Sequence, residues 1–163
     1  MMKKLVIING VPGAGKTTVC KELYKSISDS VWLDGDWCWM MNPFVVNEEN
    51  KSMVEDNISF LLRSYLNNSS YKYIIFNWVI GNEKIFETIL SKLDDIEFQL
   101  YKISLISSPK VLKERMLEDG RTEEQIKNSI SRLKSYEDMD TFKIDTTNMS
   151  VKNVVSKILE MIK

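Results

Sequence analysis

The sequence predicts an α/β fold in which helices cover both faces of a parallel β-sheet, giving three layers. Three observations lead to this prediction. Apolar, β-branched runs alternate along the chain with segments of helical periodicity, five times in succession. No internal repeat, low-complexity tract or linker interrupts the alternation. The length of 163 residues suits one domain with a substantial core, and we expect residues 1–163 to form it.

The first strand ends in a glycine-rich turn. An apolar run at residues 5–8 predicts a buried strand, and a helical pattern follows the turn. Between them, Gly10-x4-Gly15-Lys16-Thr17 matches the phosphate-loop pattern at each fixed position. Glycines let backbone N–H groups approach phosphate oxygens closely, and the N-terminus of a helix favours an anion.

This pattern also predicts the chemistry of the turn. Lys16 reaches the β- and γ-phosphates of a nucleoside triphosphate, and the Thr17 hydroxyl binds Mg²⁺. The strand before the turn and the helix after it disfavour the alternative of a simple glycine-rich turn with a surface lysine. We therefore expect ATP and Mg²⁺ as cofactors. The residues expected to bind the nucleotide here are Gly10, Pro12, Gly13, Ala14, Gly15, Lys16, Thr17 and Thr18.

A second strand at residues 31–33 is followed by Asp34-Gly35-Asp36. Two carboxylates two residues apart in extended chain point to the same side. One can hold Mg²⁺ or its waters, while the other orients or deprotonates an attacking hydroxyl. We expect Asp34 beside the metal with Thr17 and Asp36 beside the acceptor, although these two roles are interchangeable at this stage. The alternative is a solvated Asp-Gly turn.

Aromatic side chains follow the ends of the second and third strands. Trp37 and Trp39 come directly after the acidic pair, Phe44 lies a little further on, and Trp78 follows the third strand. Their faces are suited to stacking a planar acceptor, and the alternative is that they wall a hydrophobic lid. Trp32 alternates with apolar neighbours and is expected in the core.

The remaining segments continue the alternation. A helix over residues 48–66 places Val54, Ile58, Leu61 and Tyr65 on one face. Pro109 suits the first turn of a helix, and Thr122-x-x-Gln125 is a capping box. The other expected strands are residues 71–76, 98–106 and 141–144, and the other expected helices are residues 17–27, 82–93, 109–118, 122 onward and 150 onward.

The polar residues after these strands are expected to form one site. In parallel sheets, ligands bind beyond the carboxyl ends of the strands. The phosphate loop, residues 34–36, Asn77 and residues 107–109 all follow a predicted strand. We therefore expect them at one edge of the sheet. Arg63, on the helix over residues 48–66, either anchors an anionic acceptor there or stays on the surface.

Arginines are scarce in the chain and concentrated in one region. There are four, against eighteen lysines, and Arg115, Arg121 and Arg132 fall within eighteen residues around Asp119-Gly120. Arginine is suited to phosphate because its planar fork donates two parallel hydrogen bonds. A mobile turn carrying Arg121 can close over ATP and exclude water. The alternative is ordinary ion pairing along a helix.

Composition excludes several classes of function. A formal net charge of −1 argues against binding to nucleic acid or to an anionic membrane, and no apolar run approaches the length of a membrane span. We expect a cytoplasmic protein, because the apolar run after Lys3-Lys4 is too short for a signal peptide. Cys20 and Cys38 are then free thiols. The absence of histidine excludes histidine catalysis and histidine metal ligation.

The chain resembles the small phosphate-loop kinases, a group that includes nucleoside and nucleotide kinases, shikimate kinase, adenylylsulfate kinase and chloramphenicol phosphotransferase. The resemblance spans essentially the whole chain. Its specific parts are the phosphate loop, the Asp-x-Asp pair and the series Arg115…Arg121…Arg132-x3-Tyr136. It implies a P-loop NTPase fold of the nucleotide-kinase type, with a five-stranded sheet in the order 2-3-1-4-5.

The resemblance also implies roles for individual residues. Arg115 would stack on adenine, Arg121 would be the lid arginine that stabilises the transferring group, and Arg132 would contact a further phosphate. Residues 144–147, which include Thr146, resemble the loop at the adenine edge. We expect an acceptor-binding segment at about residues 36–70 and a short lid at about residues 115–125. The residues expected at the acceptor are Asp36, Trp37, Trp39, Phe44, Arg63, Asn77 and Trp78.

Two departures from the family pattern bear on the substrate. Nucleotide kinases usually have an aspartate where this chain has Asn77, whose amide can hold a metal-bound water but brings no charge. The acidic role then falls to Asp34 or Asp36. The lid is also short, with one arginine near its tip. These departures favour a neutral or singly charged acceptor, such as a nucleoside, a cyclic alcohol or an antibiotic hydroxyl, over a nucleotide monophosphate.

The sequence thus favours an ATP- and Mg²⁺-dependent kinase of a small molecule. Its expected catalytic residues are Lys16, Asp34, Asp36 and Arg121. The alternative is a nucleotide-binding regulator or a slow ATPase without an acceptor, which the missing acid at Asn77 suggests. A GTPase switch is disfavoured because no Asn-Lys-x-Asp motif occurs, and a motor because no extra helical subdomain fits. A monomer and a homodimer are equally compatible with the sequence.

Overall fold

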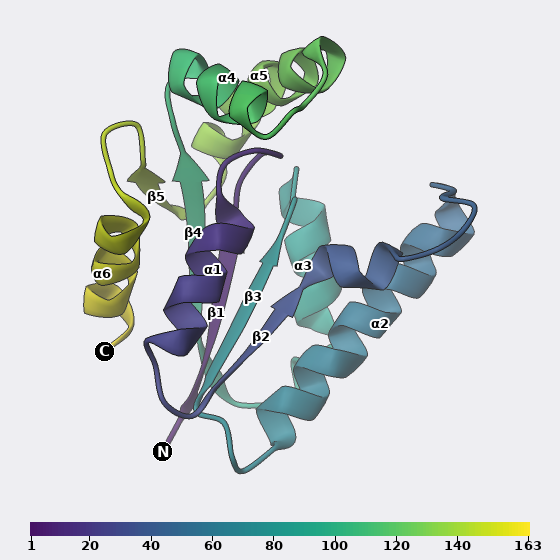
Figure 1. Cartoon of the computed structure of the whole chain (residues 1–163). Helices are drawn as coiled ribbons and strands as arrows, with labels where there is room; N and C mark the ends of the chain where they lie inside the picture. Colours follow the sequence, from purple (N-terminus) through teal and green to yellow (C-terminus); the bar gives the residue numbers. More distant parts are fainter.

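The computed structural model, which describes residues 1–163, has a three-layer α/β fold around one parallel sheet (Figure 1). The order of the five strands is β2-β3-β1-β4-β5, as the resemblance implied. The strands are β1 (Lys3–Asn9), β2 (Ser30–Asp34), β3 (Tyr73–Trp78), β4 (Phe98–Ile106) and β5 (Phe142–Asp145). Each strand is followed by at least one helix, so every connection crosses over a face of the sheet.

Helices begin at residues that the sequence marks as caps. Asn82 accepts a hydrogen bond from the Ile85 N–H, and Thr122 and Gln125 form the predicted capping box. Pro109 is the first residue of its helix, where its missing N–H costs nothing. The helices are α1 (Lys16–Lys25), α2 (Glu48–Asn67), α3 (Glu83–Ser91), α4 (Pro109–Glu118), α5 (Glu123–Asp138) and α6 (Val151–Ile162).

The central strand β1 is buried on both faces. Leu5, Val6, Ile7 and Ile8 are fully buried because helices cover both sides. Helices α1 and α6 pack against each other on one face, and α2 and α3 pack against each other on the other (Figure 1). Helices α4 and α5 lie over the carboxyl ends of the strands, while both chain termini lie at the opposite end (Figure 1).

Local structure differs from the sequence prediction in three places. The third strand covers Tyr73–Trp78 and not residues 71–76, so Asn77 and Trp78 lie within its end and do not follow it. A 3₁₀ helix, Gly35–Trp39, follows β2 where extended chain was expected, because the Asp34 carboxylate accepts the Asp36 N–H and turns the backbone. In α2 the predicted face is shifted, so that Leu62 and Leu66 are buried while Leu61 and Tyr65 are half-buried.

Cys20 and Cys38 are free thiols, as expected. None of the helices combines the length and the apolar character needed to cross a bilayer.

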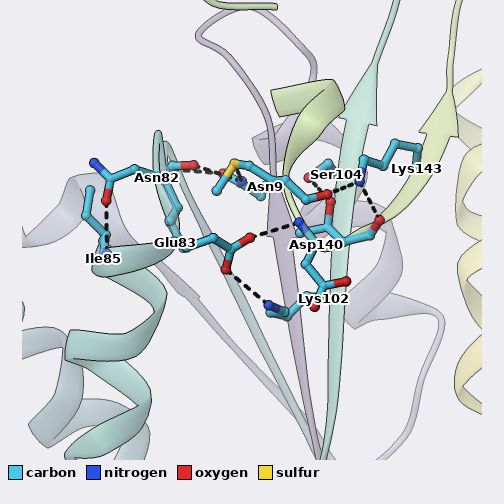
Figure 2. A network of polar contacts seen from close by, with 11 residues as sticks. Asn9, Asn82, Glu83, Ile85, Lys102, Ser104, Asp140 and Lys143 are labelled. Atoms are coloured by element: carbon cyan, nitrogen blue, oxygen red, sulfur yellow. Dashed lines mark hydrogen bonds and ion pairs between the residues drawn. The ribbon is translucent and has the colours of Figure 1, made fainter. Parts of the chain in front are cut away.

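A polar network joins the start of α3 to the connection between α5 and β5 (Figure 2). One oxygen of Glu83 accepts the Asp140 N–H at 2.9 Å, and the other lies 3.4 Å from Lys102 Nζ. Lys102 also lies over the Phe86 ring, 4.8 Å from its centroid. Nearby, the hydroxyls of Ser104 and Thr141 are hydrogen-bonded at 2.7 Å. The network thereby fixes the end of α5 to the sheet below the carboxyl-terminal edge.

Replacing Glu83 by alanine removes the acceptor of the Asp140 N–H and the partner of Lys102. We expect the free energy of unfolding to fall by about 1–2 kcal/mol, at the lower end of the cost of losing a hydrogen bond to a charged group, because Glu83 is partly exposed to solvent. Urea denaturation measures it. Glu87→Ala, an exposed position on the same helix, is the control and should change stability by less than about 0.5 kcal/mol. Equal losses in both variants would contradict a stabilising role for the network.

Candidate active site

The N-terminus of α1 is the one helix start that no side chain caps. Gly15 occupies its cap position in a left-handed conformation, at φ 91°, and the first N–H groups of the helix point into the loop without a side-chain acceptor. The other five helices are capped by Asn47, Asn82, Ser108, Thr122 and Ser150. The structure therefore leaves a set of free backbone donors at the phosphate loop, as an anion site requires.

Gly13 is required in the loop for two reasons. Its φ of 86° lies in the left-handed region, which side chains disfavour. A Cβ at this position would also lie 2.4 Å from Met116 Cγ in α4, which is far below a van der Waals contact. The loop and α4 consequently pack at a distance that only glycine permits.

Lys16 is buried beneath the loop. Its Nζ donates to the carbonyl oxygens of Gly10, at 2.7 Å, and Val11, at 2.9 Å. Burial lowers the pKa of Lys16 to about 8, although the carboxylates of Asp36 and Asp34 favour the charged form. The ammonium group is thus poorly solvated in the free protein and held by neutral carbonyls.

Thr17, Asp34 and Asp36 are linked through hydrogen bonds. The Thr17 hydroxyl donates to one oxygen of Asp34 at 2.9 Å, and the Asp36 N–H donates to the other at 3.0 Å. Asp34 is buried, whereas Asp36 is exposed. Partial desolvation of its carboxylate in the site and the neighbouring Asp34 nevertheless raise the pKa of Asp36, and Lys16 and Arg121 oppose this rise. The structure therefore brings both carboxylates to the phosphate loop, although through a 3₁₀ turn.

Gly35, between the two aspartates, makes room for an aromatic ring. A Cβ on Gly35 would lie 2.5 Å from Trp78 Cγ, so any other residue would displace this side chain. The sequence Asp-Gly-Asp is thus explained by close packing at its centre as well as by the two acids.

A cavity of about 360 Å³ lies in front of the phosphate loop. It contains the charged groups Lys16, Asp36, Asp119 and Arg121, and Trp78 forms part of its wall. Its lining residues are Pro12, Gly13, Gly15, Lys16, Thr17, Thr18, Asp36, Asn77, Trp78, Val79, Asp119 and Arg121. We call it the front cavity.

A second cavity of about 360 Å³, the rear cavity, opens on the other side of the loop. Arg115 lines it and donates to the hydroxyl and the carbonyl oxygen of Thr146, at 2.8 and 2.7 Å. Met149 and Val151 provide an apolar wall beside α6. Arg115 and Thr146 therefore lie together, as the resemblance implied, at the place expected for a base.

Some predicted site residues lie elsewhere. The Arg63 guanidinium donates to both Asp95 oxygens and to the Lys92 carbonyl, near the end of the sheet opposite the phosphate loop. Of the two roles that the sequence left open, these contacts favour the surface role over that of an acceptor anchor. Arg132 is exposed on α5 and lines neither cavity, which gives no support to a phosphate contact.

The predicted aromatic cluster is divided into separate groups. Trp78 lines the front cavity, whereas the rings of Trp39 and Phe44 pack together at 5.8 Å further out. Trp37, half exposed, packs on Trp32 with their ring centroids 5.0 Å apart. Trp32 was expected in the core but is only half-buried, and its indole N–H is hydrogen-bonded to Asn77 at 2.6 Å.

Comparison with known proteins places the chain in a family. The family model described as an AAA domain matches residues 6–140. The chain belongs to the AAA-domain family. Among curated proteins, no sequence matches this AAA-domain chain.

Solved structures share the fold of this AAA-domain protein. The tunicamycin resistance protein of Deinococcus radiodurans is 19% identical, with a TM-score of 0.76, over 98% of this chain and 95% of the other. A gluconokinase from Sinorhizobium meliloti is 14% identical, with a TM-score of 0.70, over 97% and 90%. A shikimate kinase from Acinetobacter baumannii in complex with shikimate is 16% identical, with a TM-score of 0.66, over 99% and 93%. These similarities confirm the predicted resemblance to small phosphate-loop kinases and their fold.

The donor set of this AAA-domain site fits magnesium. No three side chains of His, Cys, Asp or Glu gather anywhere in the structure to hold a metal by themselves. The hydroxyl of Thr17 and the carboxylate of Asp34 lie together at the mouth of the loop. Mg²⁺ in phosphate sites is typically held by one or two oxygen side chains together with phosphate oxygens and water.

Sequence reasoning missed some residues that line the two cavities. Val79, after β3, and Asp119, at the end of α4, contribute to the front cavity, and Asp119 also lines the rear one. Asp119 precedes Gly120 and was interpreted only as a helix break. Its position two residues before Arg121 in the chain could have indicated that it lies in the same site.

Lys16 gives a pH-dependent prediction for the free protein. Between pH 8 and its ordinary pKa of 10.5, unfolded chains retain a lysine proton that the folded protein has lost. The free energy of unfolding of the wild type should therefore rise relative to Lys16→Met by about 1–3 kcal/mol across this range. Chemical denaturation at a series of pH values measures the difference, with the exposed Lys21→Met as the control for a lost charge. A wild-type advantage over Lys16→Met that does not grow with pH would contradict the assignment.

Proposed function

We propose that the protein is an ATP- and Mg²⁺-dependent kinase that transfers the γ-phosphate to a hydroxyl of a small molecule. The main observation behind the proposal is that an acidic pair lies against the phosphate loop, through a hydrogen bond and a shared cavity. The Thr17 hydroxyl is bonded to Asp34, and Asp36 lies in the same cavity as Lys16 and Arg121. Further support comes from the names of two structural neighbours, a gluconokinase and a shikimate kinase.

The nucleotide would lie across the phosphate loop. Its phosphates would accept hydrogen bonds from the uncapped N–H groups of α1, and Lys16 would exchange its two carbonyl partners for phosphate oxygens. The base would occupy the rear cavity beside Arg115 and Thr146. On binding, the Lys16 ammonium would gain anionic partners, which favours its charged form.

Thr17 and Asp34 would hold the metal ion. Mg²⁺, when bound, would supply positive charge that neutralises the β- and γ-phosphate oxygens and orients them. Arg121 enters the front cavity from the turn between α4 and α5. It would donate to the transferring phosphoryl group and, with the turn, exclude water from it. We assign residues 115–125 as the lid.

Asp36 would act on the acceptor. A carboxylate that receives a proton from the acceptor hydroxyl leaves an oxygen that bonds to the γ-phosphorus, while the bond to the β-phosphate breaks and ADP departs. Partial desolvation and Asp34 already raise the pKa of Asp36, which makes it a better base. Asp36 would therefore both orient and deprotonate the hydroxyl.

The front cavity favours a neutral or singly charged acceptor. Its cations are Lys16 and Arg121, both assigned to the nucleotide, and the cavity also holds the acids Asp36 and Asp119. No further arginine or lysine is present there to bind a second anionic group. A nucleoside, a cyclic alcohol or an antibiotic hydroxyl fits these conditions, with Trp78 as the aromatic surface in the cavity.

The proposal is tested by coupled measurement of ADP release from MgATP, with and without panels of nucleosides, cyclic alcohols and aminocyclitol antibiotics. An acceptor should stimulate ADP release, and the product should gain the mass of one phosphoryl group. Lys16→Ala should abolish the stimulated rate, because the phosphates lose their principal cation. ADP release that no acceptor stimulates would favour a slow ATPase or a regulator.

Asp36→Asn separates binding from chemistry. The amide keeps the shape of the side chain but cannot take a proton, so turnover should fall about 10²–10⁴-fold. The affinity for MgATP, measured by calorimetry, should stay within about threefold of the wild type, because Asp34 and the loop are unchanged. Full turnover in this variant would exclude Asp36 as the base.

A further inference from the structure

Asn77 is a buried polar residue at the centre of the site. It lies in β3 directly opposite Asp34 in the register of the parallel sheet. Its side chain is 1% exposed, yet it lines the front cavity together with Lys16 and Thr17. A buried amide has an oxygen that accepts and a nitrogen that donates two hydrogen bonds, so its orientation decides what it offers the cavity.

Trp32 fixes that orientation. Its indole nitrogen can only donate, and it lies 2.6 Å from Oδ1 of Asn77, so the amide oxygen must face the indole. Trp32 is itself held between two rings, stacked on Tyr24 of α1 at 5.5 Å and packed against Trp37 at 5.0 Å. Rotation of the amide would place two donors against each other and leave the indole N–H without an acceptor.

The Nδ2 atom of Asn77 has no protein partner. The one hydrogen bond of the side chain is that to Trp32, and both N–H groups of the amide remain available at the front cavity. The Nδ2 atom is open to the front cavity, so water can accept its hydrogen bonds when no ligand is bound. A ligand acceptor that enters the cavity can therefore take the place of that water.

The nature of that acceptor follows from the donor. A metal-bound water directs its hydrogens away from the metal and therefore needs an acceptor. The donating side of the Asn77 amide faces the cavity, so Asn77 is wrongly oriented to hold a metal-bound water, the role that its sequence position suggested. An anionic oxygen is a suitable partner for this donor. Thr17 and Asp34 are hydrogen-bonded to each other and placed for the metal, and Lys16 and Arg121 line the same cavity as Asn77.

We propose that Nδ2 of Asn77 donates a hydrogen bond to an oxygen of the γ-phosphate of bound ATP, and that Trp32 is the positioning residue that aims it. This inference rests on the proposed binding of MgATP. The chain thus replaces the negative charge that related kinases place at the end of this strand with a neutral donor. The consequence is selective affinity for ATP over ADP.

The test is Asn77→Asp, which keeps the size of the side chain and an oxygen for the Trp32 indole but replaces the donor with a negative charge. Calorimetry with MgATP and with MgADP gives both dissociation constants. We expect the affinity for MgATP to fall about tenfold or more and that for MgADP to change less than about threefold. If Asn77 held a metal-bound water instead, the aspartate would bind MgATP as tightly as the wild type or more tightly, which would overturn the proposal.

Two further variants complete the experiment. Asn57→Asp adds the same charge on the exposed surface of α2 and should leave both dissociation constants unchanged. Trp32→Phe keeps a ring but frees the amide, and should weaken MgATP at least about threefold without a matching loss for MgADP. Equal losses for both nucleotides would overturn the proposal.

The failure of the proposed function would be seen separately. If the wild type binds MgATP with the Asn77-dependent preference but no acceptor stimulates ADP release, the kinase proposal fails and this inference stands. If the wild type does not bind MgATP, both are overturned.

Discussion

The uncapped N-terminus of α1 is the constraint on which the rest of the site depends. Backbone donors at this position have no internal acceptor, whereas every other helix start has one from a side chain. Strand β1, buried from Lys4 to Asn9, leads directly into the loop, and the close packing of Gly13 against Met116 restrains the loop from the side. A rigid set of unpaired donors is preorganised for an anion, because little reorganisation is needed when it binds.

The charges around the loop complement this arrangement. Lys16 is buried and its ammonium group is bonded to backbone carbonyls. Asp34, Asp36 and Arg121 lie near enough to shift the pKa of Lys16, and Asp34, Lys16 and Arg121 shift that of Asp36. In the free protein these groups partly neutralise one another. A triphosphate with its metal would bring negative charge to the lysine and positive charge to the carboxylates. The polar network at Glu83 fixes the end of α5 that leads to β5, whereas the turn with Arg121, which we propose as the lid, lies at the other end of this helix.

Much of the fold and part of the site could be predicted from the sequence. Strand and helix periodicity, caps such as Thr122 and the phosphate-loop spacing are local signals, and all were found in the structure. The order of the strands came from the family resemblance. The sequence could not decide between the two roles of Arg63, because its partner, Asp95, lies thirty-two residues away in the chain and no local pattern links them.

The orientation of Asn77 shows the same limit of sequence reasoning. Whether its amide accepts or donates depends on the indole of Trp32, on a neighbouring strand forty-five residues away. The 3₁₀ turn after Asp34 likewise depends on a side chain accepting a backbone N–H. Spacing predicted which residues would meet at the sheet edge, but the hydrogen bonds between them determine what each one does.

The most direct test of the central claim is a crystal structure of the protein with Mg²⁺ and a non-hydrolysable ATP analogue. The account predicts that the phosphates lie on the N–H groups at the start of α1, with Lys16 Nζ moved from the Gly10 and Val11 carbonyls to phosphate oxygens and the metal beside Thr17 and Asp34. Phosphates bound away from this loop, or Lys16 still bonded to both carbonyls in the complex, would contradict it.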